Sequence, residues 1–177
     1  MQENKFRFNS IEHIGFYNGI IDELNLEYWI NLVYQYQKEN PISVLKSNAG
    51  GWQSRSDLHI NPPFLPLVRL LQKNIDLIEP HKNNYINGLW INISPPLSYN
   101  RIHNHTTNND NSLSGVLYLK TPLKSGDIEF FPSLDVNHPY PHTPTPKELL
   151  IFKQKLSHSV DPNFSQDDRI SIAFNLN

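Results

Sequence analysis

Cysteine is absent from the 177 residues of this sequence. Disulfide frameworks, zinc–thiolate sites and thiol nucleophiles are therefore excluded, and any metal has to be held by His, Asp, Glu or backbone oxygen. An excess of one charge is also missing, since 15 Lys and Arg stand against 17 Asp and Glu. This balance leaves no electrostatic footprint for nucleic acid and no basic run for a membrane surface. We therefore expect neither nucleic acid nor a membrane as a partner.

Long hydrophobic runs are missing as well. No apolar stretch approaches the length of a membrane span, and residues 1–9 contain no apolar core of a signal peptide. A cytoplasmic protein is the expectation. The length fits one domain, 1–177, that can bury a core without disulfide or metal staples. The sequence gives no indication of the oligomeric state.

Two segments in the first half have the periodicity of amphipathic helices. The first spans 26–38, where Asn25 is a candidate N-cap, and the second spans 65–77. Between them, residues 47–54 have the composition of a plain connecting loop, although a lid over a site is an alternative. The sequence thus predicts two helices joined by an irregular segment.

After residue 84 the pattern changes to short strands separated by turn residues. The expected strands span 85–93, 101–105, 113–120, 127–131, 149–152, 157–161 and 169–176. The Pro-rich stretch 137–146 is expected to be a surface loop. Helices followed by many short strands indicate an α+β, mainly β fold containing a sandwich or small barrel. We expect 1–83 to form a helical supporting region and 84–177 to form the β core.

The sequence has eight histidines, and most need no function. Five have no ligand-like partner, and the last two of these are expected to be exposed: His13, His59, His81, His138 and His142. The other three can form a metal site. If 101–105 is extended, His103 and His105 point to one side with Cα atoms about 6–7 Å apart. His158, in another strand-like segment, is the candidate third ligand of a facial arrangement with open positions.

A lone His-x-His pair is weak support, because two exposed histidines beside a polar turn give the same pattern. Arg169 adds to it. It lies eleven residues after His158 across a polar turn, and an antiparallel return would bring it alongside His158. Arg169 and Ser171 share a strand face, where a guanidinium fork and a hydroxyl can capture a carboxylate. The alternative is an arginine in a structural salt bridge at a strand end.

These segments resemble the 2-oxoglutarate/Fe(II)-dependent oxygenase superfamily, and the match that carries motifs runs from Trp90 to the C-terminus. The resemblance rests on His103-x-His105, on Ser-Gly-Val-x-Tyr at 114–118, on Gly-Asp-Ile at 126–128, on His158, and on Arg-Ile-Ser-Ile-Ala-Phe-Asn at 169–175. More narrowly, the chain is similar to a small branch seen in marine bacteria and their phages, to which Gly-Gly-Trp-Gln-Ser at 50–54 is similar too. A phage-encoded chain would act in the host cytoplasm.

The resemblance implies a double-stranded β-helix (jelly-roll) core with supporting N-terminal helices, Fe(II) as cofactor and 2-oxoglutarate as co-substrate. It implies that Arg169 and Ser171 bind the distal carboxylate of 2-oxoglutarate. Tyr118 either adds a hydrogen bond to the co-substrate or is a buried structural tyrosine. The implied reaction consumes O2, releases succinate and CO2, and hydroxylates a substrate. A prolyl side chain is one candidate, and a small metabolite or nucleobase stays open.

Position 105 departs from the family pattern, since most members have Asp or Glu as the second ligand. One interpretation is a metal held by His103, His105 and His158. In another, one of His103 and His105 binds and the carboxylate comes from elsewhere; the available acids are Asp110, Asp127 and Glu129. In the third, water or an anion fills the position. We prefer three histidines because their spacing matches and no acid does better.

Two other functions are compatible with the same residues. A cupin-like three-histidine metal enzyme would share the barrel and the ligands without using 2-oxoglutarate, and it would not need Arg169 with Ser171. A non-enzymatic jelly-roll that serves as a structural or binding protein would need none of the histidines. A response to divalent metals separates the last alternative from the other two.

Overall fold

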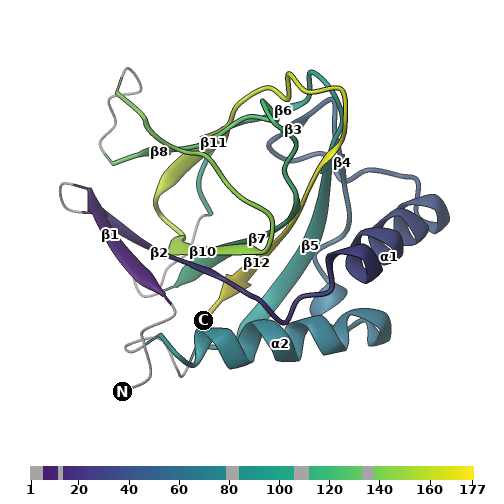
Figure 1. The fold of residues 1–177 in the computed structure, drawn as a ribbon, viewed down its shortest axis with the longest axis horizontal. Helices are drawn as coiled ribbons and strands as arrows, with labels where there is room; N and C mark the ends of the chain where they lie inside the picture. The colour runs from purple at the N-terminus through teal and green to yellow at the C-terminus, as the bar shows by residue number, and fades with distance from the viewer. Residues whose placement is uncertain (1–5, 12–13, 79–83, 106–111, 133–137) are drawn as a thin grey trace.

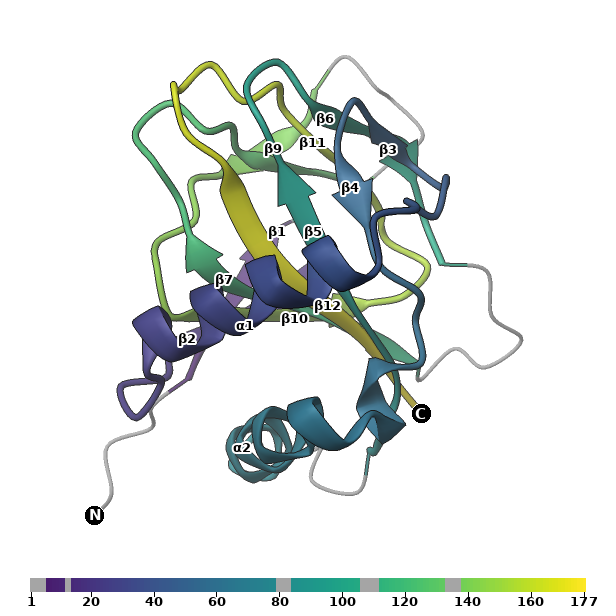
Figure 2. The same cartoon turned by 90° about the vertical axis from the view of Figure 1, so that its right-hand side faces the viewer.

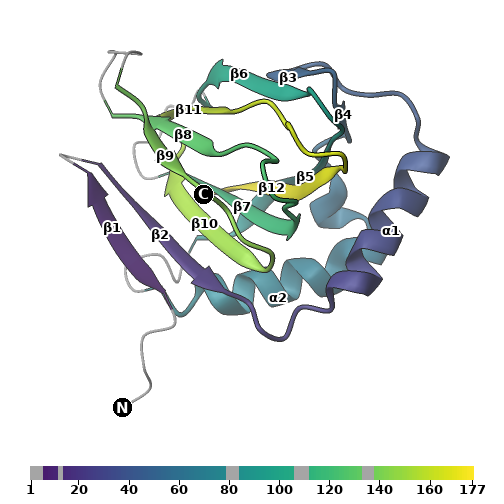
Figure 3. The same cartoon turned by 45° about the horizontal axis from the view of Figure 1, so that its top comes forward.

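The computed structural model describes residues 6–11, 14–78, 84–105, 112–132 and 138–177. Two antiparallel sheets face each other, and two helices lie on the outer side of the larger sheet (Figures 1 and 3). The larger sheet contains β1 (Arg7–Ile11), β2 (Ile14–Ile20), β10 (Glu148–Lys153), β7 (Leu113–Lys120), β12 (Arg169–Leu176), β5 (Ile86–Ser94) and β4 (Trp52–Gln53), in that order. The smaller sheet contains β3 (Asn48–Ala49), β6 (Tyr99–His103), β11 (Ser157–Val160), β8 (Ile128–Phe131) and β9 (Tyr140–His142), in that order.

Both predicted helices are confirmed. Helix α1 (Leu26–Glu39) begins after Asn25, whose Oδ1 accepts the backbone N–H of Tyr28 at 3.1 Å. Helix α2 (Leu65–Ile75) follows two 3₁₀ turns, Leu58–Ile60 and Pro62–Phe64. Figure 2 shows α1 lying across the outer face of the larger sheet. No helix among the described residues is long and apolar enough to cross a membrane.

Strand β12 divides its residues between two environments because side chains alternate along a strand. Ile170, Ile172 and Phe174 are fully buried in the core that the helices cover. Arg169 and Ser171 lie on the opposite face and line a cavity between the sheets. The strand therefore separates the residues that stabilise the fold from those that face the cavity.

A second apolar cluster joins the two sheets. Its buried members are Phe16, Tyr118, Ile128, Phe130, Leu150, Phe152 and Leu156. The rings of Phe16 on β2 and Phe130 on β8 stack with centroids 5.2 Å apart. Tyr118, Ile128 and Phe152 also line the cavity. This cluster therefore packs the space between the sheets up to the edge of the cavity.

The structure corrects two expectations about loops. Residues 47–54 are not a plain loop, because β3 pairs with β6 in the smaller sheet and β4 pairs with β5 in the larger one. The Pro-rich stretch 137–146 contains β9, which pairs with β8 at the edge of the smaller sheet. The sequence also predicted no strand before residue 84, whereas β1 and β2 form a hairpin that extends the larger sheet through β10.

Candidate metal centre and cavity

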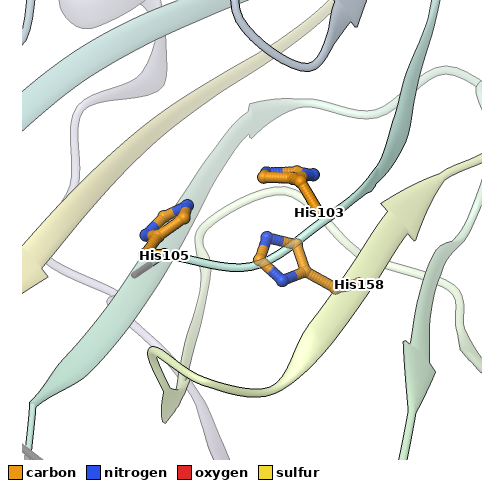
Figure 4. Close-up of side chains that lie close together, drawn as sticks. All are labelled: His103, His105 and His158. Atoms are coloured by element: carbon orange, nitrogen blue, oxygen red, sulfur yellow. The ribbon is translucent and has the colours of Figure 1, made fainter. Parts of the chain in front are cut away.

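Three histidines meet between the sheets. His103 at the end of β6 pairs in register with His158 on β11, and His105 follows two residues later. One nitrogen from each ring lies within 4.8 Å of the others, and Figure 4 shows the three rings around a common space. The expected extension through residue 105 is wrong, because β6 ends at His103. Instead, the backbone N–H of His105 donates to the carbonyl of Gln154 at 2.9 Å.

Two of the rings are oriented by backbone carbonyls. Nδ1 of His103 lies 2.8 Å from the oxygen of Arg101, and Nδ1 of His158 lies 2.9 Å from the oxygen of Leu156. A carbonyl can only accept, so each Nδ1 carries the proton and donates it. The lone pair of each ring is then on Nε2, as required of a metal ligand whose other nitrogen is fixed by a hydrogen bond.

The third ring is held by side chains that the sequence analysis did not assign to the site. Nδ1 of His105 lies 2.8 Å from Oδ1 of Asn175 and 2.7 Å from Oγ of Ser114. The Ser114 hydroxyl donates to the same Asn175 oxygen at 2.9 Å. Both residues lie in motifs that carried the family resemblance, but nothing in their spacing points to His105. This arrangement also leaves Nε2 of His105 with a free lone pair.

Burial keeps the three imidazoles neutral. It lowers the pKa of His103 and of His105, and it lowers the pKa of His158 to about 3, with the neighbouring His103 acting in the same direction. His158 is only 5% exposed. Neutral imidazoles are the form that binds a divalent metal, so the cluster needs no proton release before it can act as a ligand set.

No acidic side chain belongs to this cluster among the described residues. Glu129, one of the acids considered as an alternative ligand, accepts a hydrogen bond from the Ser159 hydroxyl at 3.0 Å. Asp127, the second acid, is likewise outside the group of neighbouring ligand atoms. Asp110 lies outside the described residues. The geometry therefore favours the three-histidine interpretation over the acids that can be located.

Arg169 lines the same cavity and is 3% exposed. Its Nη1 donates to the carbonyl of Ser125 at 2.9 Å, and its Nη2 donates to Oγ of Ser94 at 3.4 Å. Burial lowers its pKa, yet a guanidinium stays charged in proteins. No described carboxylate lies within ion-pair distance of it, so the structural salt bridge considered as an alternative is not observed. A buried guanidinium without an ion-pair partner among the described residues is a candidate binding group for an anion.

The expectation that an antiparallel return places Arg169 alongside His158 is wrong. Strands β11 and β12 are not adjacent, because β11 pairs with β6 and β8 while β12 pairs with β5 and β7. The polar turn between them carries the chain from the smaller sheet to the larger one. Arg169 and His158 therefore come from opposite sheets and line the cavity from both.

The cavity has a volume of about 550 Å³ and contains every residue that the sequence assigned to the site: His103, His105, His158, Arg169, Ser171 and Tyr118. Ser171 on β12 is directly opposite Tyr118 on β7 in the strand register. Tyr118 is 3% exposed, and burial raises the pKa of its hydroxyl, which stays protonated and able to donate. Residues far apart in sequence thus converge on one space.

The histidines expected to be incidental behave differently from one another. His138 is exposed, as expected. His142 is not, because its side chain is 18% exposed and its Nε2 lies 2.9 Å from a carboxylate oxygen of buried Glu148. His59 is half-buried, with Nδ1 3.3 Å from the carbonyl of Ser56. His13 and His81 lie outside the described residues.

Comparison of the sequence with models of protein families gives no match, and comparison with curated proteins gives none either. Solved structures are similar. The non-haem alpha-ketoglutarate-dependent carbocyclase SnoK from nogalamycin biosynthesis superposes with a TM-score of 0.71 at 11% identity, over 91% of this chain and 78% of that one. A Pseudomonas putida prolyl-4-hydroxylase gives 0.66 at 14% identity, over 93% of both chains.

A third similar structure is HygX from Streptomyces hygroscopicus with nickel, 2-oxoglutarate and hygromycin B bound. It gives a TM-score of 0.65 at 15% identity, over 93% of this chain and 83% of that one. At such identities the likeness establishes the fold. The two facing sheets are therefore the double-stranded β-helix (jelly-roll) that was expected, in a chain that is mainly β.

Proposed function

We propose that this chain is a non-haem Fe(II)- and 2-oxoglutarate-dependent oxygenase. His103, His105 and His158 hold the metal, and Arg169 with Ser171 binds the distal carboxylate of 2-oxoglutarate. The observation that supports this most strongly is a single cavity in which three neutral imidazoles with free Nε2 atoms accompany a buried guanidinium. Neither feature alone requires both a metal and a dicarboxylate.

The donor set fits the proposed metal. Imidazole nitrogen is a suitable ligand for Fe(II), and three ligands leave positions for other molecules to bind. The three Nδ1–H groups are each held by an acceptor, so the rings are oriented before the metal arrives. Such outer hydrogen bonds raise the basicity of the ligands and fix their direction. The cluster is therefore organised as a metal site.

The residues that the larger sheet presents to the cavity fit the proposed co-substrate. Arg169 presents a planar fork that matches a carboxylate, and Ser171 supplies a hydroxyl two residues along the same strand face. Tyr118 lies across from Ser171 and provides a further hydroxyl to the cavity. We assign Tyr118 as a hydrogen-bond donor to the co-substrate. The charge of the dicarboxylate would then compensate the buried guanidinium.

When bound, iron and 2-oxoglutarate supply the oxidising power for inserting oxygen from O2 into a C–H bond, with succinate and CO2 as by-products. The chain itself positions both molecules and restricts water. Val116 and Ala173, which are paired across β7 and β12, and Phe152, whose ring lies 4.9 Å from that of His158, give the cavity apolar walls. The protein thus contributes orientation and exclusion, and the oxidation chemistry belongs to the groups that it binds.

The geometry weakens the two alternatives. A three-histidine enzyme that does not use 2-oxoglutarate gives no reason for a buried arginine without a described carboxylate partner. A non-enzymatic jelly-roll gives no reason for three oriented, neutral imidazoles.

Because a Pseudomonas putida prolyl-4-hydroxylase is among the similar structures, peptides containing proline are reasonable first substrates in a hydroxylation assay.

The experiment that tests this proposal replaces Arg169, the residue proposed to bind the distal carboxylate. Arg169→Ala should weaken 2-oxoglutarate binding by roughly two orders of magnitude, because a charge-assisted bidentate pair is lost. Metal content should stay unchanged. Calorimetry on Mn(II)-loaded protein measures both quantities, and Fe(II) with 2-oxoglutarate in the absence of oxygen should give a weak visible charge-transfer band. Arg69→Ala, an exposed arginine on α2, is the control. Iron-loaded wild type without the band, or an unchanged affinity in Arg169→Ala, contradicts the proposal.

A further inference from the structure

The cavity is positively charged although the chain is not. Its lining contains three cationic side chains, Lys46, Arg101 and Arg169, and no Asp or Glu among the described residues. The whole chain has a net charge of −2. With 17 acidic residues available in the sequence, this selective lining is a property of the site and not of the composition. A cavity lined by one sign of charge concentrates ligands of the opposite sign.

Lys46 and Arg101 form a rim separate from the buried anchor. The backbone N–H of Arg101 on β6 donates to the carbonyl of Ser47 at 2.9 Å, and Lys46 directly precedes Ser47. The amide of Asn100 donates to the Ser47 hydroxyl at 3.1 Å, which fixes the two segments together. Figure 1 shows β3 and β6 side by side at this edge. Both cations therefore lie at the edge where the smaller sheet borders the cavity.

Both rim cations, Lys46 and Arg101, are exposed. Neither forms an ion pair with an acidic residue in the part of the chain that the structure describes. Val44 and Ile102 line the cavity beside them, and Ile102 is 49% exposed. The rim thus places two exposed cationic side chains beside an apolar surface.

This inference rests on the proposed function, in which a bound metal adds to the positive charge of the cavity. Three histidines are neutral ligands, so a divalent metal keeps both of its charges, whereas a carboxylate ligand would cancel one. Together with Arg169 and the rim, the loaded cavity would have five positive charges, and 2-oxoglutarate cancels two of them. The co-substrate pairs with Arg169, whereas Lys46 and Arg101 stay exposed at the rim with their charges available. A further anion would be attracted there.

We propose that the substrate of this site carries an anionic group, a carboxylate or a phosphate, that binds between Lys46 and Arg101. The neutral part of the substrate lies against Val44 and Ile102 and extends toward the histidines. The recognised chemistry is an oxyanion on an otherwise uncharged body. A cationic substrate such as an aminoglycoside is repelled.

The test uses full-length protein loaded with Mn(II) and saturating 2-oxoglutarate, so that Arg169 is already occupied. Two matched pairs serve as probes: benzyl phosphate against benzyl alcohol, and phenylacetate against phenylacetamide. Calorimetry should show the anionic member of at least one pair binding about tenfold more tightly, with a preference that falls as salt is added. The pair with the larger preference tells phosphate from carboxylate recognition.

Substitutions of the two rim residues test whether the anionic probe binds between them. Lys46→Gln with Arg101→Gln should reduce the preference for the anion at least about fivefold. The affinity for 2-oxoglutarate should fall much less, because Arg169 still binds its distal carboxylate. Lys38→Gln with Arg69→Gln changes the net charge equally on the two helices and should keep the preference. Equal binding of charged and neutral probes, binding of neither anion at millimolar concentration, or an unchanged preference in the rim variant overturns the proposal.

The same titrations on metal-free protein separate this proposal from the proposed function. If wild type fails to bind Mn(II) and 2-oxoglutarate, the oxygenase assignment fails. The rim is still tested there by comparing the anionic probes on wild type and on the Lys46→Gln, Arg101→Gln variant. Loss of anion binding in that variant supports the rim, and unchanged binding rejects it.

Discussion

Asn175 and Ser114 fix the tautomer and the ring orientation of His105. Without an acceptor at Nδ1, an imidazole has two tautomers and can rotate, and only one combination presents Nε2 to the other histidines. The contacts of 2.8 Å to Asn175 and 2.7 Å to Ser114 select that combination. His103 and His158 use backbone carbonyls for the same purpose, which no side-chain substitution can remove. His105 is therefore the ring whose orientation can be tested by mutation.

Asn175→Ala should lower the affinity for Mn(II) or Fe(II) by about 10- to 100-fold, the usual effect of removing a partner of a metal-bound histidine. Ser114→Ala should have a smaller effect, because the Asn175 oxygen is retained. Asn92→Ala, on the neighbouring strand and also facing the cavity, should leave metal affinity unchanged. Competition with a metallochromic indicator measures all three variants. Equal affinities for Asn175→Ala and wild type would show that His105 needs no such support.

The buried histidine of β11 predicts how stability depends on pH. Burial holds the pKa of His158 at about 3 in the folded protein, against an ordinary value of 6.5 in an unfolded chain. As pH falls below 6.5 the unfolded chain takes up a proton that the folded chain does not, so the folded state loses stability down to about pH 3. The metal-free protein should therefore melt at a lower temperature at about pH 5 than at about pH 7.

His158→Gln should make this dependence less steep, because the substituted side chain no longer titrates, while the lowered pKa values of His103 and His105 keep part of it. His138→Gln, which alters an exposed histidine, should keep the slope of the wild type. Differential scanning calorimetry across the pH range gives the comparison. Parallel curves for His158→Gln and wild type would mean that other groups carry the effect.

At the scale of elements, long patterned segments were predicted well. Both helices follow from helical periodicity, which burial on one face imposes. Strands 113–120 and 169–176 follow from longer apolar-rich runs between turn residues, and both are buried on both faces. Three of the elements that were missed, β3, β4 and β9, are too short to have such a pattern. β3 and β4 have two residues each and exist only through their partners in the sheets. β9 contains Pro141, which a strand tolerates at a sheet edge, where no partner needs its N–H.

The candidate site was predicted less completely than the strands. Period-2 geometry put Arg169 and Ser171 on one face of β12, and the structure agrees. The contact between His105 and Asn175, 70 residues apart, depends on how the sheets pack and has no local signal. The same holds for the crossing from β11 to β12, since a polar turn looks alike whether it returns within one sheet or passes to another.

The turn before β8 allows a prediction about the arginine anchor. Gly126 has a φ of +95°, and a Cβ there would collide with the carbonyl of Asp161 and lie 3.1 Å from Nη1 of Arg169. Gly126→Ala should destabilise the fold by about 1–3 kcal/mol and also weaken 2-oxoglutarate binding. Gly88→Ala on β5 is the control, because its Cβ would make only an ordinary contact of 3.7 Å. Urea unfolding and calorimetry measure the two effects. A Gly126→Ala variant as stable as wild type would contradict the strain.

At the scale of the whole molecule, the larger sheet serves two purposes at once. Its outer face packs against α1 and α2 and forms with them the larger of the two apolar clusters. Its inner face lines the cavity and keeps polar groups such as Arg169 and Ser171. The smaller sheet has few residues in the main core and is joined to the larger one by the cluster around Phe16 and Phe130. The stability of the sandwich should therefore depend strongly on that cluster.

Phe16→Ala should cost about 3–5 kcal/mol of unfolding free energy, because it removes a ring that is 2% exposed and stacked on Phe130. Phe8→Ala, on the neighbouring strand β1 and 58% exposed, should cost less than about 1 kcal/mol. Chemical denaturation gives both values. Similar losses in the two variants would show that the hairpin, and not the cluster between the sheets, determines stability.

The placement of the histidines on one sheet and the arginine on the other has a mechanical consequence. A molecule that reaches from the imidazoles to the guanidinium cross-links the two sheets non-covalently. Dissociation of that molecule and separation of the sheets are then coupled, so a longer residence time of the bound molecule goes with a more rigid protein.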